Sequence, residues 1–177
     1  MRSKFSSVLA GVLITASVFI NHSYAKSPAK AGPISEDVSW TIEKTTVSAT
    51  ITIPGGQEGP YPAVVFVAGS GPTDRDWNSK LMPGTNGSGR LLAEELSGNG
   101  FVVLRYDKRV TGPYAEGNIV FLTGKISLQS HVEELAGAVA QLRARADVNL
   151  KQIFVLTNSA GAIHALNYQS QKELKFA

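Results

Sequence analysis

The 177-residue chain contains no cysteine. This absence excludes disulfide bonds, thiolate metal sites and a cysteine nucleophile. A strong excess of one charge is also missing, because 17 Lys and Arg residues stand against 14 Asp and Glu residues and the two signs alternate along the chain. Without a basic stripe interleaved with aromatic side chains, the composition predicts no nucleic-acid partner.

Long apolar runs are equally scarce, and the longest lies near the N-terminus. Arg2 and Lys4 precede an apolar run over residues 8–20, and small residues lead up to Ala25. This pattern is typical of a secretory signal peptide over residues 1–25, so we expect export to the periplasm or the medium and no membrane attachment after cleavage. An uncleaved membrane anchor is the alternative, although the run is shorter than the roughly 20 residues that a bilayer span needs.

One domain is expected after the signal peptide. Residues 26–36 contain Pro and Lys with little to bury, which predicts a linker ahead of a domain over residues 37–177. Apolar and polar residues alternate over residues 38–42 and 47–54. The alternation predicts two antiparallel strands at the edge of a sheet.

Three later apolar runs predict strands that are covered on both faces, over residues 63–69, 101–107 and 153–157. Helical patterns lie between them and after the last one. Strands that alternate with helices in this way predict an α/β fold, with a mostly parallel sheet and helices on both of its faces. The ligand site of such a sheet lies beyond the carboxyl ends of its strands.

The first predicted helix starts at Ser88, which could cap it, and the inward residues are expected to be Leu91, Leu92 and Leu96. The clearest helix begins at Ser127, because apolar residues recur at steps of four and three, at positions 128, 132, 135, 139 and 142. Its other faces are expected to carry His131, Glu133 and Glu134. A last helix is expected from residue 160 toward residue 171.

The segment that carries the most chemistry is the turn around Ser159. An apolar strand stops there and a helix follows at once, with the small residues Ala160 and Gly161 on the helix side. A nucleophilic serine held on a sharp strand-to-helix turn has this pattern. The alternative is that Ser159 only caps the last helix.

Acyl transfer also needs backbone N–H groups directed at the developing oxyanion. The N–H of Ala160 is one expected donor, because it opens a helix. The other is expected in the glycine-rich loop after residue 68, from Ser70 or, next, Gly71, with Gly69 and Gly71 allowing a close backbone approach. A dinucleotide-binding loop is the rival interpretation, but the third glycine of that motif is missing.

Charged residues follow the strand that ends near residue 107. Asp107 and Arg109 are predicted to have a supporting role in an ion-pair or backbone network that holds the loops, because buried charges require partners. The segment 74–76 is predicted to be a solvated loop rather than a metal site. No metal or other cofactor is required. His164 follows Ser159 on the same helix and is predicted to be a packing or surface residue, not the base.

With these segments identified, the chain resembles the alpha/beta-hydrolase superfamily, and within it bacterial exported esterase-like and serine-aminopeptidase-like proteins. The resemblance is carried by four ordered motifs, ITIPGG (51–56), VAGSGPTDRD (67–76), LRYDKR (104–109) and TNSAG (157–161). It implies Ser159 as nucleophile and the N–H groups of Ser70 and Ala160 as oxyanion donors. The chain departs from the family at Thr157 and Asn158, where Gly and His are usual, and at Val110, where Gly is usual.

The resemblance implies a serine hydrolase that acts on small-molecule esters or other acyl compounds through an acyl-serine intermediate. The family's acid and histidine follow the nucleophile on later strands and loops, so the sequence predicts the N-terminal part of such a fold, inactive or nearly so as given. One alternative is a non-catalytic remnant or binding module. Another is half of a two-chain hydrolase whose partner chain donates the missing groups.

Overall fold

The computed structural model describes residues 31–56 and 58–172. The predicted signal peptide lies outside these residues. The described elements are β1 (Ile34–Ile42), β2 (Thr45–Ile53), β3 (Tyr61–Val67), α1 (Ser88–Gly98), β4 (Val102–Tyr106), α2 (Ala115–Leu122), α3 (Leu128–Arg143), β5 (Val148–Thr157) and α4 (Gly161–Lys172). Among these helices none is long and apolar enough to cross a bilayer.

Five strands form one mixed sheet in the order β1-β2-β4-β3-β5. β1 pairs with β2 as an antiparallel hairpin, and β2 runs antiparallel to β4. β3 lies between β4 and β5 and is parallel to both. The predicted α/β architecture, with a hairpin at the edge of a parallel sheet, is therefore confirmed.

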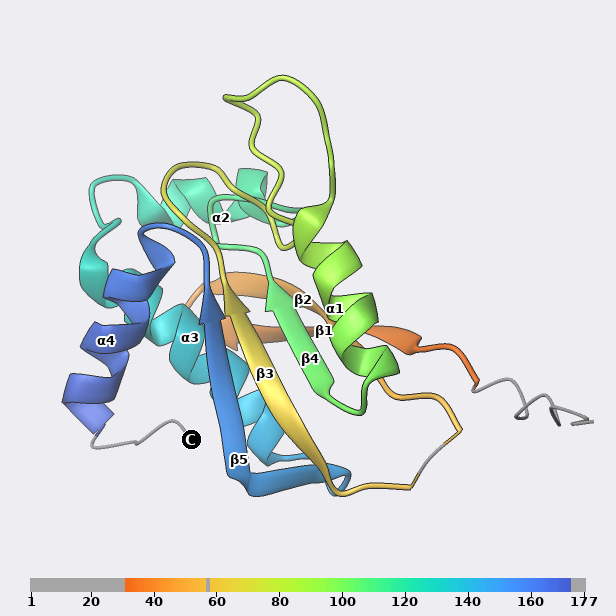
Figure 1. Ribbon diagram of the computed structural model, residues 1–177. Helices are drawn as coiled ribbons and strands as arrows, with labels where there is room; N and C mark the ends of the chain where they lie inside the picture. The colour runs from red at the N-terminus through yellow and green to blue at the C-terminus, as the bar shows by residue number, and fades with distance from the viewer. Residues whose placement is uncertain (1–30, 57, 173–177) are drawn as a thin grey trace, which may run out of the picture.

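Helices cover both faces of the sheet (Figure 1). One face carries α1, whose Ala93 packs with Val64, Phe66 and Val103 from the two central strands. The other face carries α3 and α4, which bury a larger core around Val65 and the rest of the sheet. Since β3 and β4 are buried on both faces, their sequences do not alternate: β3 is a continuous apolar run, and β4 is apolar except for Arg105.

The long helix α3 follows most of its predicted pattern. Ser127 is its N-cap and forms a reciprocal capping box with Ser130. Four of the five predicted apolar positions, at 132, 135, 139 and 142, are buried. Glu134, expected on an outer face, is instead only 2% exposed because it binds a buried arginine described below.

The inward face of α1 differs from the prediction. Leu96 packs against the core cluster as predicted, but Leu91 is 53% exposed and Leu92 36%. The fully buried residues of the helix are Gly89, Ala93 and Ser97. A Cβ on Gly89 would lie 3.0 Å from the backbone O of Arg75, so the helix sits too close to its neighbours for large side chains. Ser88 does not cap the helix either. It is the first helical residue, and the N-cap position belongs to Gly87.

Two boundaries also differ from the sequence expectation. β1 begins at Ile34, inside the segment predicted as linker, because Ile34 pairs with Ile53 at the end of the hairpin. The segment between β4 and α3 also contains a short helix, α2, for which the sequence showed no helical pattern. The buried residue that fixes α2 is Asn118, whose side-chain amide donates to the backbone O of Thr46 at 2.7 Å and of Arg109 at 2.9 Å.

Candidate active site

The loops after β3, β4 and β5 meet at the carboxyl ends of these three strands, and the long loop before α1 rises above them (Figure 1). The contact between the first and third loops is close, because a Cβ on Gly69 would lie 3.0 Å from Cβ of Ser159. The first and second loops are joined by Lys108, which hydrogen-bonds to the backbone of the glycine-rich loop. The three predicted site segments thus lie together.

Ser159 occupies a strained turn between β5 and α4. Its φ of +50° is in the left-handed region that side-chain-bearing residues rarely adopt, and its side chain is exposed. The N–H of Gly161 donates to the backbone O of Asn158 at 2.9 Å, which closes the turn. Among the described residues the hydroxyl of Ser159 has no hydrogen-bond partner, so it does not cap α4 and is free to react.

Gly161 permits this turn by its lack of a side chain. A Cβ at this position would lie 2.5 Å from the backbone O of Val67, closer than real Cβ contacts come. The start of α4 therefore packs directly on the end of β3. Thr157 occupies the position where Gly is usual in the family that the chain resembles. Its side chain is accommodated because it is the last residue of β5, paired with Val67 of β3.

The two predicted oxyanion donors both have free N–H groups. Neither the N–H of Ser70 nor that of Ala160 has an acceptor among the residues that the structure describes. Ser70 is exposed, and its backbone O accepts from the hydroxyl of Thr73 at 2.9 Å, which tightens the loop. Gly71 has a φ of +69°, a conformation that favours glycine at this position.

Lys108 is the site residue that sequence reasoning missed. It is only 4% exposed, and its ammonium group donates to the backbone O atoms of Gly69 and Gly71. Burial lowers the pKa of its amine. The only sequence signal for this role was its position in the segment 104–109, between two charged residues for which a supporting role was predicted.

Asp107 anchors the long loop before α1. Its carboxylate is buried and accepts from the backbone N–H of Arg75 at 2.8 Å and from Arg75 Nη2 at 2.7 Å. Gly112 has to be a glycine here, because its φ is +70° and a Cβ would lie 2.2 Å from Oδ2 of Asp107. The supporting role predicted for Asp107 agrees with these contacts, whereas the prediction that segment 74–76 is a solvated loop is wrong.

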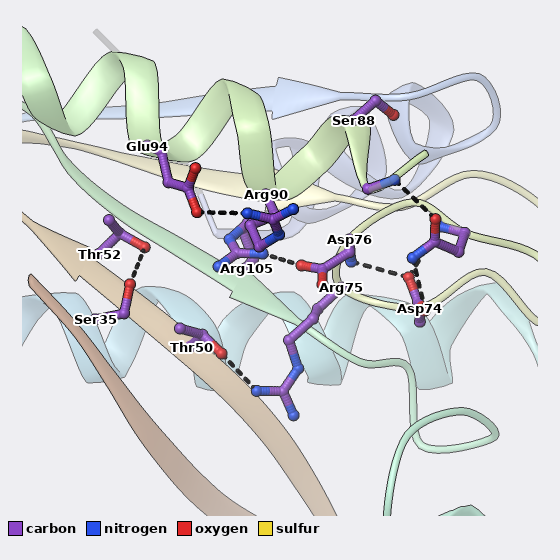
Figure 2. A network of polar contacts seen from close by, with 12 residues as sticks. Ser35, Thr50, Thr52, Asp74, Arg75, Asp76, Ser88, Arg90, Glu94 and Arg105 are labelled. Atoms are coloured by element: carbon purple, nitrogen blue, oxygen red, sulfur yellow. Dashed lines mark hydrogen bonds and ion pairs between the residues drawn. The ribbon is translucent and has the colours of Figure 1, made fainter. Parts of the chain in front are cut away.

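A second ion pair holds the same loop. Figure 2 shows Arg75 reaching to Thr50 on β2, while the neighbouring Asp76 faces Arg105 of β4 and pairs with it. Burial and the nearby charge of Arg75 lower the pKa of Arg105 to about 10. Two consecutive residues of the loop are thus fixed to two positions at the end of β4.

Arg109 joins the end of β4 to α3. Its side chain is 4% exposed and donates to Glu134 Oε1 at 3.2 Å and to the backbone O of Ser130 at 2.9 Å. Its contacts run to α3 and away from Ser159. They agree with a supporting role.

The two described histidines pack against each other below the site, with ring centroids 4.4 Å apart. Nδ1 of His131 lies 3.0 Å from Glu134 Oε2, so His131 is largely buried rather than a surface residue. Burial, followed by the charges of His131 and Lys108, lowers the pKa of His164. Neither ring hydrogen-bonds to Ser159, which agrees with the prediction that His164 is a packing residue.

A cavity of about 670 Å³ is lined mainly by the long loop before α1. Its lining comes from residues between 72 and 85, from Asp107 and from residues 111–113. Ser159 does not line this cavity. We therefore do not assign it as the pocket in which a substrate meets the nucleophile.

Comparisons with known proteins agree with this geometry. No family model matches the chain. Esterase EstD of Thermotoga maritima is 37% identical over 113 residues, which are 64% of this chain and 24% of that protein. Dienelactone hydrolase of Anabaena variabilis superposes with a TM-score of 0.59 at 21% identity, over 81% of this chain and 60% of that one. Brefeldin A esterase, a bacterial homologue of human hormone-sensitive lipase, gives 0.59 at 19% identity, over 91% and 39%.

The strand order, the strained turn at Ser159 between β5 and α4 (hereafter the elbow) and these similarities define an alpha/beta-hydrolase fold. The chain has this fold, and its sequence is similar to that of an esterase over 113 residues. It spans about a quarter of the length of EstD and at most 60% of the two structural neighbours.

Proposed function

We propose that the chain carries the nucleophile half of a serine hydrolase acting on carboxylic esters of small molecules. The observation that carries the proposal is the elbow itself: Ser159 is exposed at φ +50°, with no hydrogen-bond partner among the described residues. The free N–H groups of Ser70 and Ala160 add two candidate oxyanion donors. The similarity to an esterase over 64% of this chain supports esters as the substrate class.

In this mechanism Oγ of Ser159 attacks the ester carbonyl carbon and gives its proton to a base. The carbonyl oxygen becomes an oxyanion that accepts from the N–H groups of Ser70 and Ala160. The carbon–oxygen bond to the alcohol then breaks, the alcohol leaves with a proton, and acyl-Ser159 remains. Water cleaves the acyl-enzyme, which releases the carboxylic acid and restores the serine.

The base and its orienting acid are the part of this mechanism that the described residues do not supply. The two histidines that the structure describes pack against each other between α3 and α4, and neither hydrogen-bonds to Ser159. We therefore expect these two groups to come from elsewhere, a partner chain included. The chain by itself should form an acyl-serine slowly and hydrolyse esters feebly or not at all.

A fluorophosphonate, which phosphonylates nucleophilic serines, tests the proposal directly. The purified chain should be labelled slowly at one site, located by peptide mass spectrometry at Ser159, and Ser159→Ala should abolish the label. Ser88→Ala is the matched control, because Ser88 is an exposed serine on α1 and should leave labelling unchanged. Absence of label on Ser159 in the folded chain would instead favour a non-catalytic binding module.

A further inference from the structure

The ammonium group of Lys108 has an unusual environment. It is buried, and among the described residues it forms no ion pair; both of its hydrogen bonds go to backbone carbonyls, on Gly69 and, at 2.5 Å, on Gly71. A buried cation without a carboxylate partner is costly to a fold. Such an arrangement requires an explanation beyond packing.

The orientation of one peptide unit supplies that explanation. Gly69 C=O and Ser70 N–H belong to the same peptide, which is trans, and in a trans peptide the two groups point in opposite directions. Fixing the carbonyl therefore fixes the N–H. Pro72 follows Gly71 and has no N–H, so the second bond of Lys108 anchors the loop without orienting another donor.

The order of strands decides which way this N–H points. β3 lies between β4 and β5, so the Gly69–Ser70 peptide lies between Lys108, which follows β4, and Ser159, which follows β5. Lys108 holds the carbonyl on the β4 side. The N–H of Ser70 is thereby directed to the β5 side, where Gly69 already approaches Ser159 closely.

The charge on Lys108 acts in the same direction. A cation on the carbonyl oxygen polarises the peptide and strengthens its N–H as a donor, and the low dielectric of a buried site increases this effect. A donor that is fixed before the reaction stabilises an oxyanion without reorganisation. Orientation and polarisation thus both favour the Ser70 N–H as an oxyanion donor.

We infer that Lys108 is the positioning residue of the oxyanion hole, holding the Gly69–Ser70 peptide with its N–H directed at the acyl oxygen on Ser159. The inference rests on the proposed function, since it assumes that acyl transfer occurs at Ser159. It also makes a structural statement of its own: without the ammonium group, this peptide loses its single orientation.

Phosphonylation of Ser159 tests the catalytic part. Lys108→Met, which keeps the length of the side chain and removes its donor, should slow labelling by about 10- to 100-fold, in line with the loss of one oxyanion donor. Lys125→Met, at an exposed lysine, should label at the wild-type rate. Because the chain has no cysteine, Lys108→Cys can be aminoethylated in urea and refolded, which rebuilds an ammonium group at one position only. Aminoethylation should restore most of the lost rate, a rescue that a role in packing alone does not predict.

Amide NMR tests the structural part without any chemistry. The ¹H–¹⁵N signal of Ser70 should be single in the wild type and shifted, split or broadened in Lys108→Met, while the signals of the β1–β2 hairpin stay in place. If Lys108→Met does not fold, the same two measurements are made on Lys108→Gln, whose amide can still donate to one carbonyl and which should lie between wild type and the unmodified cysteine variant.

The outcomes separate the two proposals. Labelling of the wild type at Ser159, with an equal rate in the Lys108 variant, overturns the inference and leaves the proposed function intact. An unlabelled wild type removes the proposed function, and the Ser70 signal then decides alone: an unchanged signal in Lys108→Met overturns the inference as well.

Discussion

The elbow is most directly tested by adding one methyl group at Gly161. Its Cβ would lie 2.5 Å from the backbone O of Val67, about 0.5 Å short of the 3.0 Å below which Cβ contacts are essentially never found. The backbone O of Ala68, the residue that follows β3, lies at 3.1 Å. Because both neighbours are backbone atoms at the end of a central strand, they cannot rotate away as a side chain would, and α4 has to move.

That movement carries Ser159 with it. The N–H of Ala162 donates to the backbone O of Ser159 at 3.1 Å, so a shift of α4 by at least half an ångström is passed to the nucleophile. Overpacking of this kind costs about 1–3 kcal/mol in the free energy of unfolding. Misplacement of a reacting group by about 1 Å can cost about 100-fold in rate, so a smaller shift should slow phosphonylation of Ser159 by roughly 10-fold in Gly161→Ala.

Urea unfolding and the rate of fluorophosphonate labelling measure the two effects on the same preparations. The matched control is Gly117→Ala on α2, where a Cβ would meet nothing within 4 Å, and the change should stabilise the chain by up to about 1 kcal/mol. If Gly161→Ala is as stable as the wild type and labels at the same rate, α4 does not pack on β3 as described and the reasoning fails.

Three further changes test the surrounding network. Asp107→Asn should lower the free energy of unfolding by about 3 kcal/mol, because it breaks a largely buried ion pair with Arg75. Asp147→Asn is the control in urea titrations and should cost at most about 1 kcal/mol, because its ion pair with Arg145 is more exposed. The lowered pKa of His164 means that the unfolded chain takes up this proton first, so stability should fall as the pH drops below about 6.5, and His164→Phe should reduce that fall in unfolding experiments at pH 5.5 and 7.5. Thr157→Gly should cost about 1 kcal/mol without faster labelling, since the turn at Ser159 is already formed; a faster label would mean that Thr157 hinders the nucleophile.

The strands and the longest helix could be predicted because their apolar patterns directly reflect what they bury. The run over residues 63–67 is continuous since β3 is covered on both faces, and α3 repeats at helical spacing since only one stripe faces the core. The inward face of α1 could not be predicted in this way. Its fully buried residues are Gly89, Ala93 and Ser97, with Leu96 partly buried beside them, and residues selected for small size carry little hydrophobic signal.

Helix α2 escaped prediction for a related reason. Three consecutive apolar residues, Ile119, Val120 and Phe121, are exposed, and of its two buried residues, Asn118 and Leu122, one is polar. Hydrophobic periodicity would place the exposed apolar residues of such a helix in the core and its buried polar residue at the surface. The same holds for Glu134, which is buried because Arg109 needs a partner, a fact that becomes visible only when β4 and α3 are placed side by side.

The candidate site shows the same division between what a local pattern reveals and what tertiary contacts create. The elbow was predictable because strand, serine and small residues are consecutive in the sequence. Its supports were not, because each is a contact between two segments far apart in the sequence: Gly161 against Val67, Lys108 on Gly69, and Arg75 on Asp107. All three are backbone contacts or ion pairs and bury little apolar surface, so they produce no periodic hydrophobic pattern in the sequence. Under the proposed mechanism, these contacts hold Ser159 and the N–H groups of Ser70 and Ala160 in place before a base is added.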